Sequence, residues 1–221
     1  IKQLTDGDWE VRKIIDLDEE AQLIYFTATK VSELENHLFS ISVKGGLIKR
    51  LTNEVGWHYI QISPSKKRFI DSWSNTKTPT TYLLKNINGE YIKTLSQPDM
   101  SIFDKVNWTF PEFITIQTTD GVSLNAKITL PWNFNKFKKY PILVNTYGLV
   151  GSQMVKNRWG GRGYLWNQYL AKNGFIIFSL DNRQTGGRGK AFKNLGYNKG
   201  DFPVSESISS RIFSLPMHPY L

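Results

Sequence analysis

Two apolar runs in the second half of the sequence end in residues that could serve catalysis. The run YPILVN ends just before Tyr147, and the run FIIFSL ends at Asp181, which an arginine and several glycines follow. Such runs are typical of buried parallel strands, and α/β sheets bind ligands beyond the carboxyl ends of these strands. A phenolic hydroxyl can donate to a developing oxyanion. Tyr147 is therefore a candidate catalytic residue, although a ring packed in the sheet with its hydroxyl in water fits the same pattern.

Several other kinds of site are missing from the sequence. It contains no G-x-S-x-G, so it has no serine nucleophile elbow. It contains no cysteine, which excludes disulfides, zinc-thiolate sites and cysteine nucleophiles. The glycines around Gly186 do not form a phosphate loop, and Gly160 to Gly163 give only a weak signal for an anion site at a helix N-terminus.

The histidines of the chain are His37, His58 and His218. His37 and His58 lie beside apolar residues within a repeat of strands, so we expect them on strand surfaces rather than in a catalytic site. The sequence has no H-E-x-x-H motif and no cluster of carboxylates and histidines with the spacing of metal ligands. It therefore predicts no metal site and no cofactor.

The first hundred residues contain a weak internal repeat with a period near 45 residues, in which HLFSISVKGGLIKRLT matches TYLLKNINGEYIKTLS. Each unit predicts four short strands, the last two joined at Gly45-Gly46 or at Asn88-Gly89, residues that supply the positive φ of tight hairpins. Four strands per 40 to 50 residues is typical of a β-propeller blade. Because two blades cannot close a propeller, the chain is either truncated or contains an ordinary antiparallel meander.

The elements that would position Tyr147 and Asp181 follow a predicted linker at 107–112. A hairpin around Asp120-Gly121 precedes the two apolar strands, and the segment between those strands predicts a helix over Tyr164–Lys172, with Leu165, Tyr169 and Leu170 on one side. A hairpin followed by strand, helix and strand indicates a sheet that turns parallel and is covered by helices. The predicted fold is therefore mixed β and α/β.

The formal net charge is +9, and the stretch from Val155 to Gly200 holds nine Lys or Arg and one acid, Asp181. We interpret this stretch as a solvated surface, or as one whose acidic partner is missing, rather than as a nucleic-acid interface, because an excess of charge alone seldom indicates such an interface. No apolar run reaches the length of a membrane span.

Taken in order, the stretches GDWEV, TTDGVSLNAKITLP, KKYPILVNTYGLVGSQ, WGGRGYLWNQYLAKNGFIIFSLDNR and TGGRGKAFK resemble the dipeptidyl peptidase IV branch of the prolyl oligopeptidase superfamily. The resemblance covers residues 7–193. It implies the last blades of a β-propeller over 1–106 and the N-terminal part of an α/β-hydrolase domain over 107–193. It also implies a serine peptidase that removes dipeptides from the N-termini of peptide substrates, often after Pro or Ala. Relatives are commonly periplasmic or extracellular, and a homodimer is expected of the full-length protein.

The resemblance also assigns residues. Tyr147 matches the tyrosine whose hydroxyl forms half of the oxyanion hole, and Asp181 and Arg183 match a D-x-R turn that supports the site. Two positions depart from the family pattern, because Leu149 and Gln184 stand where the family usually has glycine. If those positions require positive φ, we expect backbone strain at both.

In the family, the nucleophilic serine and its acid and base follow this region, and the acidic residues that hold the substrate's amino terminus precede it. This chain matches neither part, so we expect it to be a middle slice without activity of its own. The tail, 194–221, instead resembles the C-terminal segment of DegT-type pyridoxal-phosphate sugar aminotransferases, which suggests a chimera. Lys193 and Lys199 are not convincing counterparts of the aminotransferase lysine. The remaining alternative is a non-catalytic interaction module built on the blades.

Overall fold

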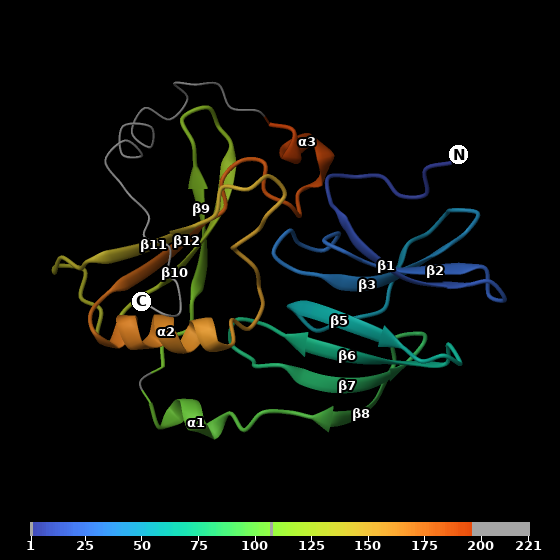
Figure 1. Ribbon diagram of the computed structural model, residues 1–221, viewed down its shortest axis with the longest axis horizontal. Coiled ribbons are helices and arrows are strands. Elements are labelled where there is room, and N and C mark those ends of the chain that lie inside the picture. Colours follow the sequence, from blue (N-terminus) through green and yellow to red (C-terminus); the bar gives the residue numbers. More distant parts are fainter. Residues whose placement is uncertain (1, 107, 196–221) are drawn as a thin grey trace, which may run out of the picture.

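The computed structural model describes residues 2–106 and 108–195 and contains three separate four-stranded sheets (Figure 1). The first sheet is an antiparallel meander of β1 (Val11–Asp18), β2 (Leu23–Ala28), β3 (His37–Ser42) and β4 (Lys49–Arg50). The second repeats this order with β5 (Trp57–Ile62), β6 (Arg68–Ser74), β7 (Thr81–Asn86) and β8 (Tyr91–Ser96). The predicted four strands per unit are confirmed, and neither sheet closes on itself.

The turns follow the glycine chemistry of the sequence. Gly45 and Gly46 link β3 to β4 with φ of 86° and 114°, and Gly89 links β7 to β8 with φ of 94°. A Cβ atom at Gly89 would come within 2.3 Å of the backbone oxygen of Leu51, so this turn must be glycine for two reasons. The second sheet thereby packs closely against the end of the first.

Both faces of the first sheet are buried. Tyr25 and Phe26 are neighbours on β2 and point to opposite faces, because side chains alternate along a strand. Tyr25 lies in a cluster with Leu38 and Leu51, which Phe69 of β6 completes from the second sheet. Phe26 lies in a cluster on the other face, where it stacks on Trp9 with ring centroids 6.4 Å apart. Phe69 therefore joins the cores of the two sheets.

The third sheet is mixed. Its order is β11-β12-β10-β9, made of β9 (Glu112–Gln117), β10 (Ser123–Thr129), β11 (Ile142–Thr146) and β12 (Ile176–Leu180). β10 pairs antiparallel with β9 and β12, whereas β11 and β12 are parallel. Helix α2 (Arg162–Lys172) forms the crossover between β11 and β12 and packs against β12. The predicted hairpin and the predicted turn to parallel pairing are both confirmed.

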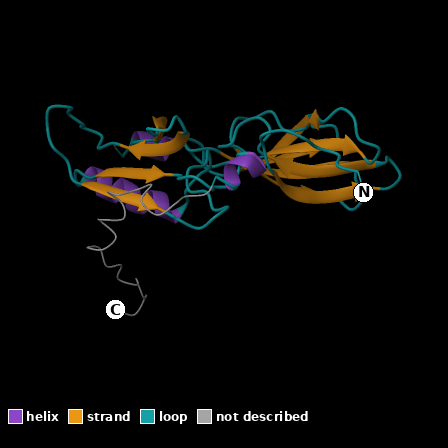
Figure 2. Cartoon of the chain, turned by 90° about the horizontal axis from the view of Figure 1, so that it is seen from above, coloured by secondary structure: helices purple, strands orange, loops and turns teal. Residues whose placement is uncertain are grey.

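Figure 2 shows the first two sheets at one end of the molecule and the third sheet at the other, with a short helix between them. Two short helices, α1 (Ser101–Asp104) and α3 (Gly189–Lys193), were not predicted. None of the helices in the described residues is long and apolar enough to cross a membrane.

The predicted apolar side of α2 was wrong. Leu165 and Tyr169 are exposed, and the helix buries Tyr164 and Ala171 instead. Tyr164 packs edge-on against Trp159, with ring centroids 4.9 Å apart, and Trp159 stacks on Trp108. The predicted linker therefore supplies part of the aromatic packing that selects the buried face of α2, and a pattern local to the helix could not reveal this.

Candidate functional site

Tyr147 and Asp181 lie at the same edge of the third sheet. Thr146 and Leu180 are paired in the parallel register of β11 and β12, and the two candidate residues come directly after this pair. The Tyr147 side chain is exposed, with 52% of its surface accessible, and its hydroxyl has no hydrogen-bond partner among the described residues. The phenol is therefore free to donate to a group outside the sheet.

Asp181 is buried and folds the loop that follows Tyr147 back onto the sheet. Its two carboxylate oxygens accept hydrogen bonds from the backbone N–H groups of Met154, at 2.6 Å, and Val155, at 3.1 Å. Burial raises the pKa of Asp181, while these two bonds and the nearby ammonium groups act in the opposite direction. The buried carboxylate of Asp181 therefore fixes the path of this loop.

Arg183 connects the same region to the hairpin between β9 and β10. Its guanidinium group donates to both carboxylate oxygens of Asp120, which lies in the hairpin turn. Hydrogen bonds from Thr118 and from Arg183 lower the pKa of Asp120. Arg183 therefore ties two turns together.

The two departures from the family's glycine pattern behave differently. Gln184 has φ of 67°, in the left-handed region that favours glycine, whereas Leu149 is absent from the described residues with positive φ. The strain expected at Gln184 is therefore present, and that expected at Leu149 is not. Gly151, two residues after Leu149, has φ of 78°. A Cβ atom at Gly186 would lie 2.6 Å from the backbone oxygen of Gly151, so the two loops pack backbone against backbone.

Residues of the first sheet and its connecting segments bind both the loop after β11 and the loop after β12. Gln153 is buried, accepts a hydrogen bond from the guanidinium group of Arg12 and donates to the backbone oxygen of Glu33 at 2.7 Å. In the second loop, the Gly187 N–H donates to the Glu10 carboxylate, and the Gly187 carbonyl accepts from the Thr29 hydroxyl at 2.7 Å. The sequence analysis missed these contacts, because their partners stand more than a hundred residues apart.

Three cationic groups surround the Trp57 ring, where the loop after β11 meets the first two sheets. The cationic groups of Arg12, Lys156 and Arg158 lie 5.5, 5.2 and 6.0 Å from the centroid of the Trp57 ring. Burial, followed by repulsion from Arg158 and Arg12, lowers the pKa of Lys156. Part of the excess of basic residues after Val155 therefore lies around the Trp57 ring and is not only a solvated surface.

The expectation that His37 and His58 lie on strand surfaces was wrong, because both side chains are fully buried. Their rings lie side by side between the first and second sheets, with ring centroids 4.8 Å apart and the ring planes tilted by 42°. His58 also forms a cluster with Glu54 and Asp71 in which ligand atoms lie within 4.8 Å of one another. The sequence analysis therefore missed a cluster with the spacing of metal ligands.

This cluster already contains a cation of its own. The ammonium group of Lys85 lies 2.5 Å from the Glu54 carboxylate and 3.2 Å from that of Asp71. His58 directs one ring nitrogen at Asp71 and the other at the backbone oxygen of Glu54. A divalent ion would have to displace the ammonium group from both carboxylates and break the His58 contact to Asp71, so these residues do not fit a metal site.

The remaining candidates have structural explanations or lie outside the described residues. A Cβ atom at Gly160 would collide with the Tyr164 ring, so packing explains this glycine without an anion. Lys193 lies 3.9 Å from the Glu10 carboxylate. His218, Lys199 and the tail that resembles an aminotransferase fall outside the described residues.

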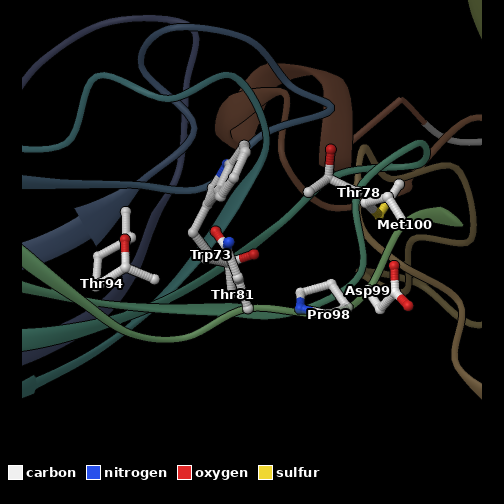
Figure 3. Close-up of a pocket in the computed structure, with 9 residues that line it drawn as sticks. Trp73, Thr78, Thr81, Thr94, Pro98, Asp99 and Met100 are labelled. Carbon is white, nitrogen blue, oxygen red and sulfur yellow. The ribbon is translucent and has the colours of Figure 1, made fainter.

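A cavity of about 500 Å³ lies at the edge of the second sheet, between Trp73, Thr81 and the segment that contains Pro98, Asp99 and Met100 (Figure 3). Its only ionisable side chain, Asp99, is occupied in a hydrogen bond with the backbone N–H of Ser101. The lining of the cavity has no histidine or lysine that could activate a nucleophile, and the sheet edge at Tyr147 remains the better candidate site.

Comparisons with known proteins agree with this architecture. Residues 1–80 match the family model described as the dipeptidyl peptidase IV (DPP IV) N-terminal region. The chain is 33% identical over 200 residues to dipeptidyl peptidase 4 of Arthroderma otae, covering 86% of this chain and 25% of that protein. It is 31% identical over 224 residues to dipeptidyl peptidase 4 of Trichophyton equinum, covering 94% of this chain and 29% of that protein.

Among solved structures, the crystal structure of Porphyromonas gingivalis dipeptidyl peptidase 4 matches with a TM-score of 0.81 and 26% identity, over 95% of this chain and 30% of that one. The fold is thus that of a mostly β protein whose open sheets match the N-terminal β-propeller region of such enzymes. Over most of its length the chain is therefore similar to the dipeptidyl peptidase IV family. It spans about a quarter of the length of the curated relatives that it matches.

Proposed function

We propose that this chain is part of a serine dipeptidyl peptidase acting on the N-termini of peptides. Residues 1–106 would contribute two blades of its propeller, and residues 107–193 would begin its α/β-hydrolase domain. The third sheet supports the second assignment, because its spatial strand order β9-β10-β12-β11 combines an antiparallel start with a parallel pair bridged by α2. In α/β-hydrolases the loop after the third strand carries an oxyanion-hole donor, and the nucleophile elbow supplies the other donor.

The observation that carries the proposal is the position of Tyr147. It follows the third strand of the sheet, β11, directly before the crossover that contains α2, and its exposed hydroxyl has no partner among the described residues. In the proposed enzyme this hydroxyl donates to the oxyanion of the tetrahedral intermediate. Removal of one such donor typically costs about 10²- to 10³-fold in kcat.

Asp181 and Gln184 would act on the loop rather than on the substrate. Asp181 binds two successive N–H groups of the loop, and the Gln184 carbonyl accepts from Gly151 at 2.7 Å. A loop fixed at three backbone groups keeps the donor in place before charge develops, and this preorganisation is what makes an oxyanion hole effective.

The proposal also predicts that the 221-residue polypeptide has no peptidase activity by itself, because its sequence contains no G-x-S-x-G elbow. The test is hydrolysis of Gly-Pro-p-nitroanilide, together with labelling by a fluorophosphonate, with Porphyromonas gingivalis dipeptidyl peptidase 4 as the positive control. We expect neither nitroaniline release nor labelling. Labelling of any serine in this chain would contradict the prediction, since it requires a serine activated by a base.

A further inference from the structure

A buried polar cluster fills the seam between the first and second sheets. We call it the seam cluster and define it by two imidazoles, three carboxylates and two cationic groups: His37, His58, Glu35, Glu54, Asp71, Arg50 and Lys85. His37, His58 and Asp71 have no accessible surface, and Lys85 has almost none. Buried charged groups are costly unless they are paired, so the protonation state of each imidazole decides whether the cluster is stable.

The partners of His37 fix its neutral form. Its Nε2 atom lies 2.7 Å from a carboxylate oxygen of Glu35, which can only accept, so this nitrogen carries a proton. Its Nδ1 atom lies 3.3 Å from the guanidinium group of Arg50, which can only donate, so this nitrogen carries none. The Thr52 hydroxyl, 3.1 Å from the same Nδ1, accepts from the Leu38 N–H and can use its own proton toward the ring.

The partners of His58 fix the opposite state. Its Nε2 atom lies 2.8 Å from the backbone oxygen of Glu54, and its Nδ1 atom lies 2.9 Å from both oxygens of Asp71. Both partners accept, since the Asp71 carboxylate also pairs with the Lys85 ammonium group 3.2 Å away. Both nitrogens of His58 therefore carry protons, and this ring is an imidazolium.

These two states balance the charge of the seam cluster. His58, Arg50 and Lys85 supply three positive charges, which the three carboxylates offset, while His37 stays neutral. A proton added to the Nδ1 atom of His37 would face the Arg50 guanidinium and would place a second positive ring 4.8 Å from His58. Within a buried site such uncompensated charge is strongly unfavourable.

We propose that acid weakens the packing of the first sheet against the second. The two sheets stay packed while His37 is neutral and separate when His37 takes up a second proton. We call this arrangement the latch. The groups facing His37 are Glu35 from the segment before β3, Arg50 from β4 and His58 from β5. Glu54, Asp71 from β6 and Lys85 from β7 act on it through His58. The strand released first is β4, because Arg50 binds both the ring and the backbone oxygens of Thr52 and Asn53.

Hydrogen bonds connect the seam cluster to the loop that follows Tyr147. Glu35 accepts from the Asn157 side chain at 3.3 Å, and the same side chain accepts from the Thr76 N–H at 3.1 Å. Asn157 itself donates its backbone N–H to Leu34 at 2.7 Å. One side chain thus connects the seam cluster, the second sheet and the loop that follows Tyr147.

The direction of the pH effect follows from linkage. Burial lowers the pKa of His37 below its ordinary value of 6.5, more than the bond to Glu35 raises it. As the pH falls below about 6.5 the unfolded chain takes up this proton and the folded chain does not, so stability is lost until the lowered pKa is reached. One proton of difference raises the unfolding constant by up to about tenfold per pH unit.

The first test is long-range ¹H–¹⁵N NMR on the labelled chain at pH 7.5. We expect a single protonated ring nitrogen, Nε2, on His37 and two protonated nitrogens on His58. A doubly protonated His37, or a His58 with one bare nitrogen, would overturn the proposal. This measurement uses the unmodified chain, so it decides the matter even if a variant does not fold.

The second test compares urea unfolding of the wild type and His37→Gln from pH 7.5 to 5.0, with His218→Gln as the matched control. Glutamine can donate to Glu35 and accept from Arg50 without titrating. We expect the wild type and the control to show the tenfold-per-unit dependence, and His37→Gln to lack that one-proton component. At pH 5 the wild-type Leu38 and Leu51 amides should exchange at least tenfold faster than in His37→Gln. Equal slopes and equal exchange in the wild type and His37→Gln would refute the latch.

Discussion

The backbone N–H of Gly151 donates to the backbone oxygen of Gln184 at 2.7 Å, which ties the loop after β11 to the loop after β12. The bond forms between the two segments that leave the parallel pair of strands, a few residues beyond Tyr147 and Asp181. To accept it, Gln184 adopts a left-handed conformation with φ of 67°. The sheet edge at Tyr147 is therefore held in part by a residue under backbone strain.

Replacing Gln184 with glycine should relieve this strain. The left-handed region costs a residue with a Cβ atom about 1 kcal/mol, so we expect Gln184→Gly to stabilise the chain by about 0.5–1 kcal/mol in urea unfolding. Gln61→Gly is the matched control, because Gln61 lies exposed within β5 and glycine in a strand should cost about 0.5–1 kcal/mol. A loss of stability in Gln184→Gly would show that the side chain matters more than the backbone conformation.

Tyr147→Phe should leave the stability of the chain unchanged. The variant removes only a hydroxyl that has no partner among the described residues on a side chain that is 52% exposed. We expect the free energy of unfolding to stay within about 0.5 kcal/mol of the wild type, as for other exposed positions without specific contacts. A loss of 2 kcal/mol or more, on the order of a broken buried hydrogen bond, would assign the hydroxyl a structural role.

Asp181→Asn should cost stability although the two side chains have the same shape. An amide can accept from only one of the Met154 and Val155 N–H groups and turns its own NH₂ group toward the other. We expect a loss of about 1–3 kcal/mol and faster amide exchange at both residues. Asp6→Asn, at an exposed position, is the matched control and should be neutral. Unchanged exchange at Met154 and Val155 would remove Asp181 from the support of the loop.

Gln153→Ala tests how strongly the first sheet holds the loop after β11. The change leaves the Glu33 carbonyl and the Arg12 guanidinium group without the Gln153 side chain as their partner. We expect a loss of about 1–3 kcal/mol, measured by urea unfolding, against a change within about 0.5 kcal/mol for the exposed Gln61→Ala. Equal effects of the two substitutions would mean that the Gln153 contacts do not hold the loop after β11 against the first sheet.

The strands and hairpins could be predicted because their signals are local. Glycines at 45, 46 and 89 supply the positive φ of two hairpins, and apolar runs mark the parallel strands β11 and β12. The edge position of Tyr147 and Asp181 followed from these runs alone. The unpredicted features depend on distant partners, since the buried face of α2 is set by Trp159 and Trp108.

The histidines show the same limit most clearly. His58 looks like a strand residue with apolar neighbours, yet its charge partner Asp71 comes from the next strand and Lys85 from the one after. His37 depends on Arg50 and on Glu35, which also binds Asn157 from the loop after β11. No spacing within one strand contains this information, so the sequence could give their identity but not their burial.

The most direct test of the proposed function grafts the loop 147–158 of this chain into Porphyromonas gingivalis dipeptidyl peptidase 4 in place of the matching loop. The graft is assayed with Gly-Pro-p-nitroanilide, with and without Tyr147→Phe. Fluorophosphonate labelling confirms that both proteins are folded. We predict an active graft in which Tyr147→Phe lowers kcat by about 10²- to 10³-fold with little change in KM. A folded, labelled graft whose kcat is the same with phenylalanine at position 147 would contradict the assignment of Tyr147 as the oxyanion donor.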